Sequence, residues 1–210
     1  MSRLERNWQY AEQYPTETDA MVRARRLSLE LGIEPVSRAV AAQLAGLAAA
    51  SAAKNICEIG TGVGVSGLAL LRYAPETTLT SIESEPEHLR QARAVFADAG
   101  VTGARLRLIE GDAAQVLPRL NHGSYDIAVI DADPAHLLDF VEQALLIVRR
   151  GGTIVVPNAF AHGRVTDPAA RDAVTHGFRD LLATVAESPA IAPVLSPAGD
   201  GLLMLTRLDA

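Results

Sequence analysis

The sequence predicts an α/β domain built on a doubly wound, mostly parallel sheet of seven strands, with helices before the sheet and an antiparallel hairpin at its end. Short apolar runs alternate with helical patterns between residues 55 and 157, which is typical of parallel strands joined by helical crossovers. Two more apolar runs lie close together near the C-terminus. We therefore expect a single domain over residues 1–210, with a helical extension at 1–50 and a core at 51–210.

The N-terminal extension carries helical patterns only. Apolar residues at helical spacing run through residues 3–31, and Gly32 is suited to end this stretch. A second helical pattern, "SRAVAAQLAGLAAAS", follows at residues 37–51. The pattern changes to short apolar runs only after this point, so we expect the extension to consist of helices.

Five apolar runs of strand length follow, each bounded by Gly, Pro, Asp or Asn. They lie at residues 55–59, 78–83, 105–110, 125–131 and 152–157. The helical patterns between them lie at 65–74, 86–100, 113–120 and 135–150. A fifth helix is expected to begin in "TDPAARDAV", with Asp167 as its cap and Pro168 in its first position.

The chain ends in a hairpin pattern. The runs "IAPVLS" and "GLLMLT" are joined by "PAGDG", a connection short enough to force an antiparallel pair. Asp200 lies in this turn, where an aspartate commonly stabilises the turn itself and could also reach a bound acceptor.

Composition excludes several classes of protein. The net charge is −6 and no basic stripe is present, which disfavours a nucleic-acid partner. No uncharged apolar stretch is long enough to span a bilayer, and the N-terminus lacks the pattern of a secretion signal, so we expect no membrane partner and a cytoplasmic location. Lys54 is the only lysine, so almost no lysine is available for catalysis.

The loop after the first strand fits two glycine motifs. Gly62, Gly64 and Gly67 match the dinucleotide pattern G-x-G-x-x-G, whereas Glu58 followed by Gly60, Gly62 and Gly64 matches E-x-G-x-G-x-G. Glu58 would repel a pyrophosphate and would attract the cationic amino group of a methionine moiety. The second motif, which favours S-adenosylmethionine, is therefore the better interpretation.

Acidic residues end four consecutive strands, where ligands bind in such sheets. Glu83 can accept the ribose hydroxyls, and Asp112 with Ala113 can contact an adenine. Each acid alone could be a helix cap, but the four together, listed in chain order, favour an S-adenosylmethionine site: Glu58, Glu83, Asp112 and Asp131. A non-catalytic protein that binds this cofactor and an NAD(P)-dependent oxidoreductase remain the alternatives.

Six stretches together resemble a known family: "EIGTGVGVSGLAL", "IESEPEHL", "GDAAQVLPRL", "YDIAVIDAD", "RRGGTIVV" and "GDGLL". They are similar to the small bacterial O-methyltransferases related to catechol and caffeoyl-CoA O-methyltransferases, and the resemblance covers residues 33–207. It implies a Rossmann-like class I methyltransferase fold with an N-terminal extension that covers the site or forms a homodimer contact. It implies that Asp131 faces cofactor and acceptor together, and that the following residues line the cofactor: Val36, Glu58, Gly60, Thr61, Ser66, Glu83, Ala113 and Asp133.

The resemblance also implies a metal site, and the sequence departs from it. The family holds a divalent cation with an aspartate ending the fourth strand and an Asp-Asn pair ending the fifth, and a lysine follows the first aspartate as general base. Asp131 and Asn158 match, but Pro134 replaces the lysine and Pro157 replaces the second aspartate. Proline supplies neither a base nor a ligand, and Mg²⁺ needs several oxygen ligands. We expect metal-independent O-methylation.

Another base would then be needed, or an acceptor that is already nucleophilic, unless the chain is a scaffold with little activity. His136 and His162 follow the fourth and fifth strands, and histidine suits general-base catalysis near neutral pH. Both can equally be exposed loop residues. We expect a small aromatic or hydroxylated acceptor, contacted by Asp131 and Asn158.

Overall fold

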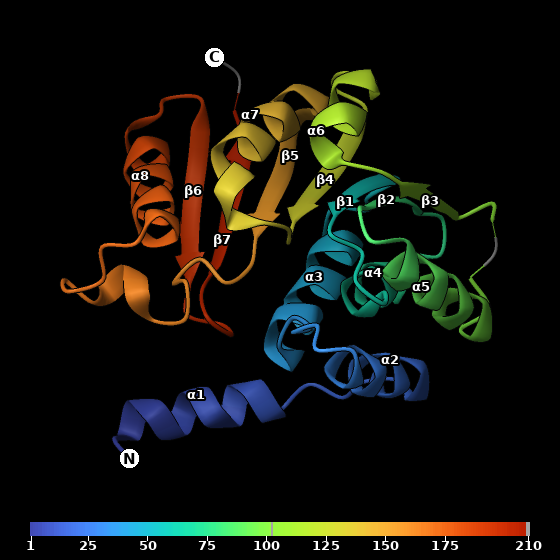
Figure 1. Cartoon of the computed structure of the whole chain (residues 1–210), viewed down its shortest axis with the longest axis horizontal. Helices are drawn as coiled ribbons and strands as arrows, with labels where there is room; N and C mark the ends of the chain where they lie inside the picture. The colour runs from blue at the N-terminus through green and yellow to red at the C-terminus, as the bar shows by residue number, and fades with distance from the viewer. Residues whose placement is uncertain (102, 209–210) are drawn as a thin grey trace.

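The computed structural model describes residues 1–101 and 103–208, and its centre is a seven-stranded sheet in the order β3-β2-β1-β4-β5-β7-β6 (Figure 1). Neighbours from β3 to β5 pair in parallel, whereas β7 is antiparallel to both β5 and β6. The strands are β1 (Asn55–Ile59), β2 (Thr78–Glu83), β3 (Leu106–Glu110), β4 (Tyr125–Ile130), β5 (Val148–Val156), β6 (Ile191–Ser196) and β7 (Leu202–Arg207). The predicted fold class is confirmed.

Helices cover both faces of the sheet, because successive side chains on each buried strand enter different cores. Ile127 and Val129 of β4 enter one core, and Ala128 and Ile130 enter the other. The first core contains side chains of α3 (Arg38–Ala50), α4 (Val65–Leu71) and α5 (Pro86–Asp98), and the second those of α6 (Ala113–Val116), α7 (Leu137–Ile147) and α8 (Ala173–Glu187). Among the described residues no helix is long and apolar enough to cross a membrane.

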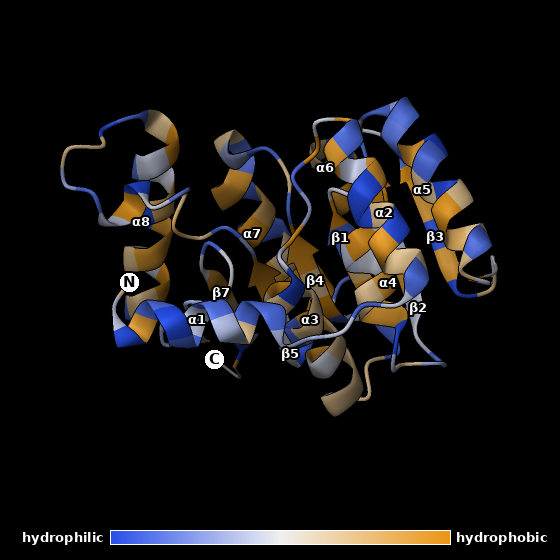
Figure 2. Cartoon of the chain, turned by 90° about the horizontal axis from the view of Figure 1, so that it is seen from below, coloured by the Kyte–Doolittle hydropathy of each residue, from blue (hydrophilic) through white to orange (hydrophobic). Residues whose placement is uncertain are grey.

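The stretch expected to be helical over residues 3–31 forms two helices, α1 (Arg3–Gln13) and α2 (Asp19–Glu30). The chain breaks between them because Pro15 cannot donate a helical hydrogen bond and Thr18 caps α2 by accepting from the Met21 amide at 3.3 Å. α2 packs against α4 and α5. α1 has no buried residue, and Figure 2, which views the sheet from the carboxyl ends of β4 and β5, shows it coloured mainly hydrophilic.

Two predicted boundaries are wrong. Asp167 does not cap the last long helix, because its carboxylate accepts from the Ala169 amide in a local turn after the short 3₁₀ helix η3 (Arg164–Thr166). Asp172 is the cap of α8, with its carboxylate 3.0 Å from the Thr175 amide. In addition, α7 ends at Ile147 and β5 already begins at Val148, since the β4–β5 register shifts after the Tyr125–Val148 pair.

Candidate active site

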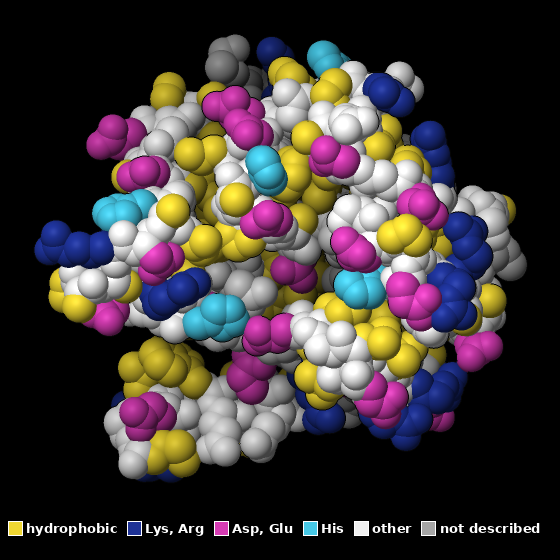
Figure 3. Space-filling view, viewed as in Figure 1, with side chains coloured by type: hydrophobic (Ala, Val, Ile, Leu, Met, Phe, Trp, Pro, Cys, Tyr) yellow, Lys and Arg dark blue, Asp and Glu magenta, His cyan; other side chains and the backbone are white. Residues whose placement is uncertain are grey.

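Three hollows lie at the carboxyl ends of the parallel strands, and Asp131 lines all three. The wide hollow, about 430 Å³, lies beside Glu83, Asp112 and Asp133. The narrow hollow, about 80 Å³, lies between residues 33–36 and the glycine loop. The β4–β5 hollow, about 120 Å³, lies between the ends of those two strands. Figure 3, viewed as Figure 1, shows acidic and histidine side chains around a depression in the middle of the molecule.

The glycine loop is shaped by contacts that a side chain would block. Gly60 has φ 89°, and a Cβ atom built there would lie 1.9 Å from the carbonyl oxygen of Asp131. Gly62 has φ 51°, and a Cβ atom built there would lie 3.5 Å from Ile33 Cγ2. The loop can therefore pass directly beside the end of β4 only with glycine at residue 60, and both glycines use left-handed backbone.

Glu58 lies fully buried beneath this loop. Ser81 donates a hydrogen bond to its Oε2 at 2.5 Å, and within the described chain its Oε1 has no hydrogen-bond partner. Burial raises the pKa of Glu58 to about 7; the hydroxyls of Ser66 and Ser81 lower it, and the charges of Asp131 and Glu83 add to the rise. A buried carboxylate oxygen without a donor fits a ligand that brings a cationic N–H group.

Glu83 holds the glycine loop from the end of β2. Its Oε2 accepts from the Gly62 amide at 2.8 Å and its Oε1 accepts from the Glu85 amide at 3.0 Å. Because a carboxylate oxygen can accept more than one hydrogen bond, both remain able to bind hydroxyls in the wide hollow. Glu83 thus combines a structural contact with the position expected for a ribose contact.

Glu58 itself lines none of the three hollows, whereas the other predicted cofactor residues line the narrow hollow, the wide hollow or, for Gly60 and Gly62, both. Gly60, Thr61, Gly62, Ser66 and Val36 line the narrow hollow. Glu83, Asp112, Ala113 and Asp133 line the wide one. Asp112 and Asp133 also cap short helical turns, accepting from the amides of Ala114 at 2.9 Å and Ala135 at 3.0 Å. The capping role considered for single acids therefore holds for these two, beside their place in the hollow.

Asp131 connects the hollows. It is partly buried, and burial raises the pKa of its carboxyl to about 6, with a further rise from the charge of Glu34. Its position between the glycine loop and the β4–β5 hollow allows it to face two ligands at once. Glu34 comes from the segment before α3, which approaches Asp131 from the opposite side of the narrow hollow.

The donor groups around Asp131 do not fit a divalent metal ion. Pro134, Pro157 and Asn158 line the β4–β5 hollow together with Asp131, so the prolines stand beside the one carboxylate and the one amide. No group of three or more His, Cys, Asp or Glu side chains in the described chain could hold a metal ion. Lys54 lies before β1, where it is paired with Glu76, at the opposite end of the strands.

The two candidate bases lie in different hollows. His136 lines the wide hollow, and its ring lies 5.9 Å from that of Phe140. His162 lines the β4–β5 hollow, and its Nε2 lies 3.9 Å from a carboxylate oxygen of Glu34. His162 therefore lines the same hollow as Asp131 and Asn158, and His136 does not. No residue of the glycine loop lines that hollow.

The loop that carries His162 has unusual backbone angles. Asn158, Ala161 and His162 have φ values of 57°, 50° and 57°, a left-handed region that is costly without glycine. Asp200 of the β6–β7 turn holds the loop, since its carboxylate accepts from the amide of His162 and from that of Gly163 at 3.2 Å. Among the described residues, the hydrogen bonds of the Asp200 carboxylate go to this second loop and not to its own turn, so the turn-stabilising role expected for Asp200 stays a prediction.

The sequence did not predict several residues of the site. Ile33, Glu34 and Ser28 line the narrow hollow, and Arg164 and Phe178 line the β4–β5 hollow. Each comes from a helix or loop outside the strand ends and belongs to no motif. The one available signal is the "EPV" stretch before α3, because proline favours extended backbone at the residue before it.

Comparisons with known proteins agree with this geometry. A family model described as O-methyltransferase matches residues 16–208. The "Probable O-methyltransferase Rv1220c" of Mycobacterium tuberculosis is 44% identical over 207 residues, which are 98% of this chain and 92% of the relative. A solved structure of a Corynebacterium glutamicum protein superimposes with a TM-score of 0.90 at 30% identity, over 99% of each chain.

The O-methyltransferase TomG of Streptomyces achromogenes, involved in tomaymycin synthesis and solved in complex with S-adenosylmethionine, superimposes with a TM-score of 0.86 at 27% identity over 100% of each chain. The predicted Rossmann-like methyltransferase fold and the predicted enzyme class are confirmed by these matches. With a family model over residues 16–208 and a relative at 44% identity, this chain belongs to the O-methyltransferase family.

Proposed function

We propose that this enzyme transfers the methyl group of S-adenosylmethionine to a single hydroxyl group of a small aromatic acceptor, without a bound metal ion. The observation that carries the proposal is the β4–β5 hollow, where Asp131, Asn158, His162 and Arg164 are the polar residues of a mostly apolar wall that contains Pro134 and Pro157. The hollow shares Asp131 with the two hollows assigned to the cofactor, so acceptor and cofactor would meet at that residue.

The cofactor fits the chemistry of the two hollows around the glycine loop and of Glu58, which is buried beneath that loop. The unpartnered Oε1 of Glu58 suits the cationic amino group of the methionine moiety, and Glu83 suits the ribose hydroxyls. Asp112 and Ala113 line the far part of the wide hollow, which has room for an adenine ring. When bound, the sulfonium of S-adenosylmethionine supplies an electrophilic methyl group.

His162 is the general base in this proposal. One ring nitrogen takes the proton of the acceptor hydroxyl while the oxygen forms its bond to the methyl carbon and the carbon–sulfur bond breaks, which leaves S-adenosylhomocysteine and a methyl ether. A carboxylate oxygen of Glu34 lies 3.9 Å from Nε2 of this histidine. Asp131 and Asn158 orient the hydroxyl, and positioning supplies much of the rate. His136 contacts the cofactor side.

The acceptor is recognised mainly by apolar contact. Pro134, Leu137, Val156, Val174 and Phe178 form walls of the β4–β5 hollow. The small volume of about 120 Å³ suits one ring or a similarly compact group. A second hydroxyl has no cation to bind, so a vicinal diol gains nothing over a phenol.

Transfer of a labelled methyl group from S-adenosylmethionine to a panel of phenols tests the proposal. Acceptors with one aromatic hydroxyl are expected to be methylated in the presence of a chelator, and matched vicinal diols to be methylated no faster. Methylation restricted to vicinal diols would contradict the proposed acceptor class.

A second copy of the chain covers α1 in this proposal. Leu4 and Trp8, one helical turn apart, are 55% and 46% exposed, and α1 buries none of its residues within one chain. Figure 3 shows this helix projecting from the body with hydrophobic side chains on it. A surface of this kind is usually covered by a partner, and its mixed charges, Arg3 and Arg6 against Glu5, suit an antiparallel copy of itself.

Sedimentation measurements test this dimer. The wild-type protein is expected to have twice the mass of the chain, and Trp8→Glu to shift it to the monomer because the substitution buries a charge in the interface. Tyr73→Glu is the matched control, since Tyr73 is an aromatic residue 58% exposed that does not belong to α1, and its replacement is expected to leave the dimer intact. A monomeric wild type at micromolar concentration would rule the dimer out.

A further inference from the structure

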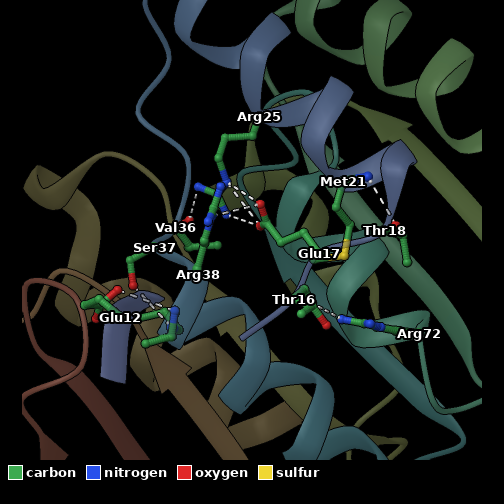
Figure 4. A network of polar contacts seen from close by, with 12 residues as sticks. Glu12, Thr16, Glu17, Thr18, Met21, Arg25, Val36, Ser37, Arg38 and Arg72 are labelled. Atoms are coloured by element: carbon green, nitrogen blue, oxygen red, sulfur yellow. Dashed lines mark hydrogen bonds and ion pairs between the residues drawn. The ribbon is translucent and has the colours of Figure 1, made fainter. Parts of the chain in front are cut away.

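A nearly buried ion pair fixes the segment before α3. Glu17, whose side chain is 3% exposed, accepts from Arg25 Nε at 3.1 and 3.0 Å and from its Nη2 at 2.5 Å. The remaining guanidinium nitrogen, Nη1, donates to the backbone carbonyl of Val36 at 2.6 Å. Figure 4 shows Arg25 between Glu17 and Val36, with Arg38 approaching the same carboxylate. We call Glu17, Arg25 and Arg38 the clasp.

The clasp holds one wall of the narrow hollow. Residues 33–36, here called the strap, line that hollow opposite the glycine loop. Among the described residues, the hydrogen bond from Arg25 to Val36 is the only one made by the backbone between Glu34 and Val36. Pro35 has no N–H group, so the strap gains little from regular structure.

The clasp is tied to the glycine loop through α4. Arg72, at the end of α4, donates to the carbonyl of Thr16 at 2.6 Å, next to Glu17 in sequence. α4 begins directly after the glycine loop, with Gly64 as its cap. Arg25 comes from α2 before the strap, and Arg38, 3.5 Å from Glu17, comes from α3 after it. The ion pair therefore sets the distance between both walls of the narrow hollow.

We infer that Arg25 and Glu17 are positioning residues for the cofactor: they hold the strap against the glycine loop so that Ile33, Glu34 and Val36 close over its methionine end. The inference rests on the proposed function only for the identity of the cofactor. It does not depend on the acceptor, the base or a metal ion.

Stability alone is a poor explanation for this pair. Burying two charges costs about as much as their attraction returns, and packed apolar residues would serve as well. The planar guanidinium of an arginine can donate hydrogen bonds to a carboxylate and, at the same time, donate another N–H to a further acceptor. Here the further acceptor is the backbone carbonyl of Val36 in the strap. A lysine could keep the charge but not both contacts.

Titration of S-adenosylhomocysteine into Arg25→Met, with wild type alongside, tests the inference. The dissociation constant is expected to rise about tenfold or more, as for loss of a charge-assisted hydrogen bond that orders a binding wall. The dissociation constant of Arg25→Lys is expected to lie between those of wild type and Arg25→Met, and that of Glu17→Gln to be similar to that of Arg25→Met. Hydrogen exchange at the amides of Ile33, Glu34 and Val36 should accelerate in all three variants.

Arg26→Met is the matched control, because Arg26 is the next residue of α2 and forms an exposed pair with Glu30 at 3.6 Å. It is expected to leave affinity unchanged. If Arg25→Met melts earlier but binds as tightly as wild type, the pair is structural only and the inference is wrong; if Arg25→Met does not fold, Arg25→Lys decides by the same criterion. Failure of wild type to bind would instead overturn the proposed cofactor.

Discussion

Glu58→Gln is expected to bind S-adenosylhomocysteine about ten- to a hundredfold more weakly than wild type, the usual effect of losing a charged hydrogen-bond partner. The buried Oε1 of Glu58 has no partner within the described chain, and the variant replaces the negative charge available to a cationic amino group. Since burial raises the pKa of Glu58 to about 7, wild-type affinity should also increase as the pH rises through that value. The variant should lack this pH dependence.

The same variant is expected to make the cofactor-free protein more stable at alkaline pH. A raised pKa means that the folded state favours protonated Glu58, so this contribution to stability is complete below the ordinary value near 4.5 and is lost as the pH rises through about 7. In urea unfolding at pH 8, the free energy of unfolding of Glu58→Gln should exceed that of wild type by up to about 3 kcal/mol, since one pKa unit corresponds to about 1.4 kcal/mol. At pH 4, below that ordinary value, the difference should nearly disappear.

Glu110→Gln is the control for both measurements. Glu110 ends β3, the strand next to β2, and is exposed. Its replacement should change neither affinity nor stability. Equal affinity of Glu58→Gln and wild type at pH 8 would show that Glu58 does not contact the cofactor.

His162→Gln is expected to lower kcat by about a hundredfold or more, the usual contribution of a general base. The affinity for S-adenosylhomocysteine should stay within about twofold, because His162 lines the β4–β5 hollow and not the two hollows proposed for the cofactor. Single-turnover rates of methyl transfer, measured with saturating cofactor, separate the chemical step from binding.

His136→Gln is the matched comparison, since His136 follows β4 as His162 follows β5 but lines the wide hollow. Its replacement should alter cofactor affinity and leave the single-turnover rate nearly unchanged. A full rate in His162→Gln would leave an already nucleophilic acceptor as the explanation, and the assignment of the base would be wrong.

The fold could be predicted from the sequence where one pattern controls one element. The β-strands and the hairpin follow from short apolar runs between glycine and proline signals, and the structure contains a strand at each of these runs. The start of α8 could not be predicted, because Asp167 and Asp172 both carry a cap signal. Asp167 stabilises only a turn, and Asp172 begins the helix because the buried side chains Thr175, Phe178 and Leu181 follow it at helical spacing.

The part of the site that lies at the ends of the parallel strands could be predicted from the sequence. Glu58, Glu83 and Asp131 gather because parallel strands end at one edge of the sheet, a rule that needs no tertiary contact. The clasp and Glu34 could not be predicted, because their positions depend on tertiary contacts. Glu17 lies in the connection between α1 and α2, and Arg25 is one of several charged residues of α2, so only the tertiary structure shows that this pair reaches the strap. No spacing in the sequence encodes that contact.

The ratio of two initial rates tests metal-free methyl transfer most directly: the rate with a chosen phenol after exhaustive chelation, divided by the rate after Mg²⁺ is restored. Asp131 and Asn158 beside Pro134 and Pro157 cannot supply the oxygen ligands that Mg²⁺ requires, so the predicted ratio is near one. A rate that falls about tenfold on chelation and returns with Mg²⁺ would contradict the account, and would mean that other oxygen atoms complete a metal site at Asp131.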